Sequence, residues 1–246
     1  MNRTTRPLHL WRSLLRAEVQ RLRDDAFLLL LLGLMPVVAL VLHQLWPVLM
    51  DRWPDWPWSA LAPFVSALLS LLTPLMMGLV LGFQCLAERE AGILAAIRLT
   101  PAGLTRALLV RLSGYAVAAG LLTPLVHQWL GLVPLGWPQA LAIGVLALPL
   151  LPFATLLVLA FARSQVEGFA IMKATGGLVS IPLLLLALMP APGYWLAAPL
   201  PTWWTLLGYV RLAEGHRIGW LWLLVGAACL LAVTTLFWVR LSRRSD

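Results

Sequence analysis

The stretch Leu86–Pro101, LAEREAGILAAIRLTP, separates two long apolar segments and determines how the chain must be arranged. It brings together Glu88, Arg89, Glu90 and Arg98 in a protein in which only 11% of the residues are charged. Charges at this density are too costly to place in hydrocarbon. The stretch therefore predicts a loop outside the membrane core that joins two membrane-spanning helices.

The composition supports a membrane protein. Hydrophobic residues make up 61% of the chain, whereas soluble domains are usually closer to half apolar. The net charge of +8 raises the possibility of a nucleic-acid partner. However, the basic residues flank the apolar segments and form no stripe with interleaved aromatic residues, so we expect membrane lipid and no nucleic acid as the partner.

Six segments can cross a bilayer, for which a helix needs about 20 apolar residues. They are Ala26–Trp46, Ala60–Cys85, Ala107–Leu130, Gln139–Ala162, Gly168–Met189 and Gly219–Val239. The fifth segment qualifies only if Lys173 lies near its end, where the long side chain can reach the interface. The predicted fold class is an all-α membrane protein with six transmembrane helices.

The positions of the basic residues predict the orientation. With six spans, fifteen of the eighteen Lys and Arg residues lie on one side of the membrane. Arg52, Arg211 and Arg217 are left on the other side. By the positive-inside rule, both termini and the loop at 86–106 are cytoplasmic.

The segment before the first span is patterned as an amphipathic helix. Its apolar residues Leu8, Trp11, Leu15, Val19 and Leu22 fall on one helical face, with arginines along the flank. This pattern predicts a cytoplasmic interfacial helix over 1–25, followed by a six-span domain over 26–246. The alternative is an unstructured basic flank.

The segment 190–217, before the last span, is apolar but interrupted. Pro192, Gly193, Pro199 and Pro201 break it, so it cannot form a full span. We expect a pair of short re-entrant helices on the outer side, buried against the protein. The alternative is a loop that lies on the membrane surface.

Motifs for chemistry are missing from the sequence. It contains no P-loop, no HExxH and no GxSxG, so no catalytic residue is assigned and we expect no metal site and no cofactor on this chain. His43 and His127 near the outer ends of the first and third spans could bind a cation or a haem iron, but polar residues are ordinary at that boundary. Energy for any uphill transport must then come from another chain.

The charged stretch itself is patterned as a short helix. Gly92 interrupts the end of the second span, and Ile93, Leu94 and Ile97 then give an apolar face at helical spacing. Thr100 and Pro101 form a cap and first position for the next helix. We expect Glu88 and Glu90 to be exposed at the start of the short helix, where carboxylates suit its dipole.

At these residues the chain resembles the membrane-domain permeases of type-2 ATP-binding-cassette (ABC) exporters. The pattern is an acidic-rich run, a glycine, a few apolar residues and then Thr-Pro before the third span. The match is closest to bacterial drug-export permeases. It is carried by Glu88-Arg89-Glu90-Ala91-Gly92-Ile93-Leu94, by Leu99-Thr100-Pro101, by Val166–Phe169 running on to Lys173, and by Pro201-Thr202-Trp203-Trp204.

The resemblance implies a permease in the bacterial inner membrane, acting as a dimer with a second copy or a related permease. A separate ABC ATPase subunit would hold ATP and Mg²⁺ and press on a coupling helix between the second and third spans. The residues implied in this ATPase coupling are Glu88, Arg89, Glu90, Gly92, Leu94, Thr100 and Pro101. Ala95 and Ala96 depart from the bulkier or acidic residues common in the family.

The resemblance also assigns residues to the two ends of the transport path. Glu167 and Lys173 would lie at the inner end of the fifth span, pairing with each other or attracting an anionic head group; the alternative for Lys173 is snorkelling without further role. The outer gate would contain Pro192, Pro201, Trp203 and Trp204. The path would be formed by the first, second and fifth spans and would carry a drug-like or lipid amphipath.

Two other functions stay open at this point. One is a haem-export permease of cytochrome maturation, suggested by His43 and His127. The other is an intramembrane lipid-modifying enzyme, for which the spans offer hydroxyl groups without a nearby base. Such hydroxyls more often form hydrogen bonds within or between helices.

Overall fold

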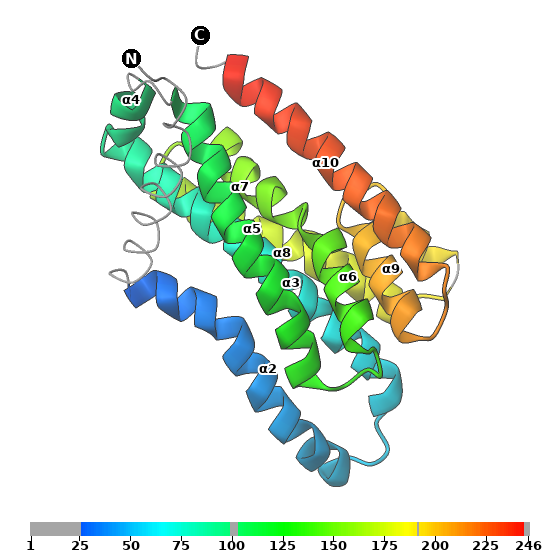
Figure 1. Ribbon diagram of the computed structural model, residues 1–246. Coiled ribbons are helices and arrows are strands. Elements are labelled where there is room, and N and C mark those ends of the chain that lie inside the picture. The colour runs from blue at the N-terminus through cyan, green and yellow to red at the C-terminus, as the bar shows by residue number, and fades with distance from the viewer. Residues whose placement is uncertain (1–25, 99–102, 191, 244–246) are drawn as a thin grey trace.

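The computed structural model describes residues 26–98, 103–190 and 192–243, and every regular element in these ranges is a helix (Figure 1). In chain order they are α2 (Ala26–Arg52), α3 (Trp58–Glu90), α4 (Ile93–Arg98), α5 (Gly103–Leu130), α6 (Trp137–Ala147), α7 (Leu150–Phe161), α8 (Gln165–Leu188), the 3₁₀ helix η1 (Gly193–Ala197), α9 (Trp203–Ala213) and α10 (Gly219–Arg243). Six helices in these ranges are long and apolar enough to span a membrane. The interfacial helix predicted over 1–25 lies outside the described residues.

The six predicted spans correspond to α2, α3, α5, the pair α6–α7, α8 and α10, so the all-helical six-span prediction is confirmed. The fourth span is divided where Leu148 and Pro149 interrupt the helix. The fifth begins at Gln165, three residues before the predicted start. The reason is an N-cap: the Ser164 hydroxyl accepts the backbone N–H of Glu167 at 3.3 Å.

Helix α3 is the central element of the bundle. It contacts α2, α5, α7, α8 and α9, and it is buried along most of its length. Gly78 and Gly82 lie against α7, where an added Cβ would overlap α7 atoms. The hydroxyl of Thr155 donates to the Gly78 carbonyl at 2.9 Å. Small residues with hydrogen-bonding hydroxyls are the usual means of close helix packing in membranes.

Helix α2 lies at the side of the bundle and contacts α3 and α5 (Figure 1). Its exposed side chains between Gly33 and Leu42 are Leu34, Val37, Leu40 and Val41. A wholly apolar outer surface of this kind suits contact with lipid. α2 is therefore held mainly by one side of its surface.

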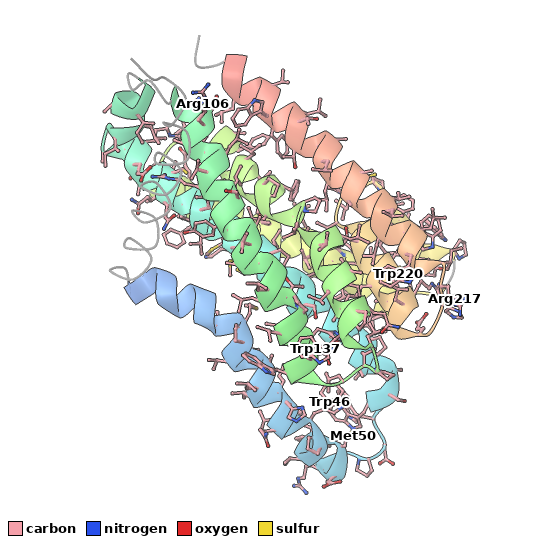
Figure 2. All side chains as sticks on the ribbon, in the orientation of Figure 1. Trp46, Met50, Arg106, Trp137, Arg217 and Trp220 are labelled. Carbon is pink, nitrogen blue, oxygen red and sulfur yellow. The ribbon has the colours of Figure 1, made fainter. Side chains whose placement is uncertain are left out.

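The two ends of the bundle differ in composition. Arg106 lies at the end that carries α4, whereas Trp46, Trp137, Trp220 and Arg217 lie towards the opposite end (Figure 2). Tryptophan is enriched at membrane interfaces. We refer to the α4 end as the inner end and to the opposite one as the outer end.

The segment before α10 folds back into the bundle. The Thr202 hydroxyl donates to the carbonyl of Leu178, and Leu178 lies ten residues before the outer end of α8. At 1.5 Å per residue this is about 15 Å inward along α8. The chain then returns outward as α9, so this segment contains two short helices, η1 and α9.

Glycines allow α9 to lie directly against α10. A Cβ added to Gly208 would lie 2.6 Å from the Leu223 nitrogen and 2.8 Å from the Gly219 oxygen. A Cβ added to Gly226 would lie 2.5 Å from the Thr205 hydroxyl. The position of the folded-back segment therefore depends on these small residues.

Replacing Gly208 with alanine is expected to destabilise the protein by about 1–3 kcal/mol, because the new methyl group overlaps backbone atoms that cannot rotate away. The measurement is the apparent unfolding temperature of the purified protein in detergent micelles.

Gly120→Ala is the matched control. Its added Cβ would have its nearest neighbour, Leu148 Cδ2, at 3.9 Å, and removing a helical glycine stabilises a helix by about 0.5–1 kcal/mol. Equal unfolding temperatures for Gly208→Ala and the control would contradict the close approach of α9 and α10.

Candidate functional site

The charged stretch at the inner end is arranged differently from the prediction. α3 continues through Glu90, and Gly92 makes the turn with φ of +73°, a conformation that favours glycine. α4 begins only at Ile93. Glu88 and Glu90 therefore lie in the last turn of α3 and not at the start of the short helix. Helix α3 continues without a break to Glu90 and therefore extends past Cys85, the predicted end of the second span.

Glu88 was predicted to be exposed, and this is wrong. Glu88 is only 7% exposed, and its carboxylate accepts two hydrogen bonds from the Arg111 guanidinium of α5, at 2.6 and 2.8 Å. Burial of a carboxylate requires a paired and hydrogen-bonded partner. This bidentate geometry supplies one and fixes α3 against α5.

Arg89 and Glu90 make similar contacts with two other helices. The Arg89 guanidinium donates to the carbonyls of Leu159, at 3.2 Å, and Ala162 at the C-terminal end of α7, where helix carbonyls lack intrahelical partners. Glu90 is exposed, and its carboxylate accepts the backbone N–H of Gln165, the first residue of α8, at 2.9 Å. Arg89 and Glu90 thus connect α3 with α7 and α8.

We call Glu88, Arg89, Glu90 and Arg111, together with Glu167, the inner charge cluster. The Glu167 carboxylate accepts the backbone N–H of Arg163 at 2.7 Å and belongs to the N-terminal cap of α8. The cluster joins the inner ends of α3, α5, α7 and α8 at one place, directly before α4 in the chain.

Helix α4 has one side turned to the bundle and one side free. Leu94 is buried, at 8% exposure, whereas Ile93 is 42% exposed. Ala91, Gly92 and Ala96 are also exposed. Leu94 therefore attaches α4 to the bundle, and the exposed side chains of α4 that the structure describes, Ile93 and Ala96, are apolar. Thr100 and Pro101 lie outside the described residues.

Lys173 and Glu167 do not form an ion pair. They lie six positions apart on α8, which places them on different sides of the helix, and Glu167 is engaged at the helix start. Lys173 is exposed and has no hydrogen-bond or ion-pair partner among the described residues.

Two of the four residues assigned to the outer gate, Trp203 and Trp204, belong to an aromatic cluster. Trp203 is fully buried, and Trp204 stacks on Trp222 of α10 with ring centroids 5.4 Å apart. Tyr194 and Trp195 of η1 complete the cluster. Pro192 is exposed before η1, and Pro201 is partly buried before α9.

A buried polar network near the outer end escaped the sequence analysis. The Tyr209 hydroxyl lies 2.6 Å from both Ser66 Oγ and His127 Nδ1, and all three side chains are buried. His43 Nδ1 lies 3.2 Å from the Leu130 carbonyl oxygen. Both histidines therefore make contacts between helices, and the described residues contain no group of three metal-ligating side chains.

The sequence from residue 18 to residue 238 matches the family described as fluoroquinolones export permease protein Rv2686c-like. The chain belongs to this family. It matches none of the curated proteins and none of the solved structures with which it was compared.

Membership establishes the broad function of the chain. The chain is a multi-pass membrane protein and an export permease of the ABC drug-export type. It is a transport subunit, and its family implies an ATPase partner.

Two residues that organise these sites were not singled out from the sequence. Arg111 lies within the predicted third span, and a charge in a span calls for a partner on a facing helix, which identifies Glu88 in retrospect. Tyr209 lies in an apolar stretch, and no short-range pattern connects it with Ser66, 143 positions away.

Replacing Glu88 with glutamine is expected to destabilise the protein by about 3 kcal/mol, because Arg111 loses the carboxylate that compensates its burial. Replacing both Glu88 and Arg111 with methionine should recover most of this loss, because no charge is then left unpaired. A double-mutant cycle on the apparent unfolding temperature in micelles measures both effects.

The matched control is Glu214→Gln at the outer end. It removes an exposed pair with Arg211, whose side chains are 31% and 35% exposed, and should change stability by less than about 1 kcal/mol. If Glu88→Gln behaved like this control, the buried pair would not hold the inner end together.

Proposed function

We propose that this permease exports a fluoroquinolone-like aromatic amphipath, driven by a separate ABC ATPase that binds ATP and Mg²⁺ and contacts α4. The observation that carries the coupling proposal is the inner charge cluster, which lies between α4 and the ends of four spanning helices. The cargo is proposed from the description of the family.

In the proposed coupling, the residues of α4 and of the inner charge cluster have different roles. Ile93 offers an exposed apolar contact to the ATPase, and Leu94 attaches α4 to the bundle. Glu88, Arg89 and Glu90 do not contact the ATPase in this proposal. They transmit the displacement of α4 to α5, α7 and α8 through contacts of 3.2 Å or less. Gly92 supplies the hinge between α3 and α4.

The transport path is proposed to form between two permeases, either two copies or this chain and a related one. α3 and α8 would line it, and the aromatic cluster around Trp203 would close it on the outer side. The first span, α2, was also expected to line the path, but its exposed side chains between Gly33 and Leu42 are all aliphatic and are suited to face lipid. The orientation follows from the basic residues: the α4 end and both termini face the cytoplasm, in the inner membrane of a bacterium.

Neither alternative function gains support from the geometry. The haem hypothesis depended on His43 and His127, and His127 is buried and hydrogen-bonded to Tyr209. A lipid-modifying enzyme would need an accessible nucleophile beside a base. The Ser66–His127–Tyr209 group has the residue types, but all three are buried among α3, α5 and α9. A lipid amphipath remains the second candidate cargo.

Replacing Ile93 with aspartate is expected to lower co-purification with the ABC ATPase encoded beside the permease by about tenfold or more, because a charge replaces an apolar contact at the docking surface. Export of norfloxacin from cells that express both subunits should fall to the level of cells without the permease. The measurements are the ratio of the two subunits after affinity purification and the cellular accumulation of the drug.

Ile218→Asp is the matched control. Ile218 is 53% exposed in the turn before α10 at the outer end, so the same substitution there should leave ATPase binding and export unchanged. A folded Ile93→Asp variant that still bound the ATPase and exported norfloxacin would refute the role of α4. Export of no fluoroquinolone by the wild type would refute the proposed cargo.

A further inference from the structure

Helix α8 carries a polar stripe on the side that no other helix covers. Phe169, Lys173 and Ser180 are exposed, and at 100° per residue they fall within a narrow sector of the helix. Gly176 lies beside them, and a Cβ added there would meet no atom within 4 Å. We call Phe169, Lys173, Gly176 and Ser180 the α8 stripe.

The position of Lys173 is unusual for a membrane protein. It lies eight residues after Gln165, about 12 Å along the helix, and Gln165 is at the level of the inner charge cluster. Among the described residues it is the one exposed cation more than two turns from the end of its helix. An ammonium group at this depth is costly in lipid and usually faces a partner or a watery cavity.

The lipid-exposed part of α2 shows what an ordinary outer surface of this protein contains. Between Gly33 and Leu42 its exposed side chains are all aliphatic. The uncovered side of α8 also exposes the aliphatic side chains of Val166, Ile181 and Leu184, but the α8 stripe adds a cation and a hydroxyl to this surface. The α8 stripe is therefore suited to line an aqueous path, and α2 over this stretch is suited to face lipid.

An aromatic ring is held in place next to this charge. Phe169 lies one turn from Lys173 towards the inner end and is 46% exposed. Its ring lies 4.9 Å from that of Phe83 on α3, and Gly168 permits this approach, because a Cβ there would come within 3.0 Å of Phe83 and Leu86. One side of the Phe169 ring therefore contacts Phe83 of α3, and the remainder of the side chain is exposed.

An aromatic ring and a cation one helical turn apart match the two ends of an aromatic carboxylic acid. Side chains at i and i+4 lie about 6 Å apart on a helix. The aryl group would stack on Phe169, and the carboxylate would form a charge-assisted hydrogen bond with the Lys173 ammonium.

We propose that Lys173 recognises the carboxylate of the exported molecule and that Phe169 contacts its aromatic rings, so that the α8 stripe selects aromatic acids. This inference rests on the proposed function, because fluoroquinolones are fused aromatic rings that bear a carboxylate. Lys173 is then a specificity-determining residue of the path.

The test compares norfloxacin with its methyl ester, which lacks the negative charge. The full-length permease is placed in nanodiscs of neutral phosphatidylcholine, and binding is followed by the intrinsic fluorescence of the quinolone. Lys173→Gln should weaken norfloxacin binding about tenfold or more and leave ester binding unchanged. Lys173→Arg should retain the preference for the acid, and the outer-end control Arg217→Gln should behave as the wild type.

Several outcomes would overturn the inference. Unchanged norfloxacin affinity in Lys173→Gln, or equal loss of acid and ester, would remove Lys173 from recognition. If the wild type showed no preference for the acid but retained phosphatidylglycerol more strongly than Lys173→Gln, the residue would hold a lipid phosphate instead.

Failure of the proposed cargo is distinguishable from failure of this inference. If the wild type bound neither quinolone, the proposed cargo would be refuted, and 1-naphthoate would then be the probe in the same nanodiscs. Naphthoate binding that is weakened about tenfold by Lys173→Gln would still support the recognition of aromatic acids. Equal binding by both proteins would overturn it.

Discussion

The buried ion pair between Glu88 and Arg111 is the constraint on which the inner half of the molecule depends. Two charges removed from water are tolerated only when they face each other in good geometry, so the pair holds the end of α3 against α5. Arg89 and Glu90, the next two residues of α3, add contacts to the end of α7 and the start of α8. Four spanning helices thereby meet directly before α4, and a force applied there would reach all of them.

Interactions of another kind hold the outer half together. No ion pair joins helices distant in sequence there among the described residues; instead, Gly208 and Gly226 bring α9 and α10 into direct contact. Trp204 of α9 also stacks on Trp222 of α10. Charge contacts between helices therefore hold the inner end, whereas close packing, stacked rings and the hydrogen bonds of Tyr209 hold the outer end.

The positions of the spans were predictable because a length of about 20 apolar residues is a local property. The start of α8 was predictable in principle as well, since Ser164 and Glu167 form a capping signature. The exposure of Glu88 was predicted wrongly. A carboxylate in a charged loop looks solvated, and only the facing Arg111, 23 positions away, shows that it is buried. The contacts of Tyr209 with Ser66 and His127 join residues that are still further apart in the sequence, so no local pattern predicts them.

The sequence by itself determined the class of this protein, its six spans and the place of the short helix between the second and third spans, because hydrophobic length and charge placement act through the solvent and need no partner. The tertiary structure alone decided what the charged residues do. It assigned Glu88, Arg89 and Glu90 to contacts within the bundle, left Ile93 free, and placed Lys173 beside Phe169 on an uncovered face. Burial and pairing depend on which helices become neighbours, and that is settled only when the whole chain is packed.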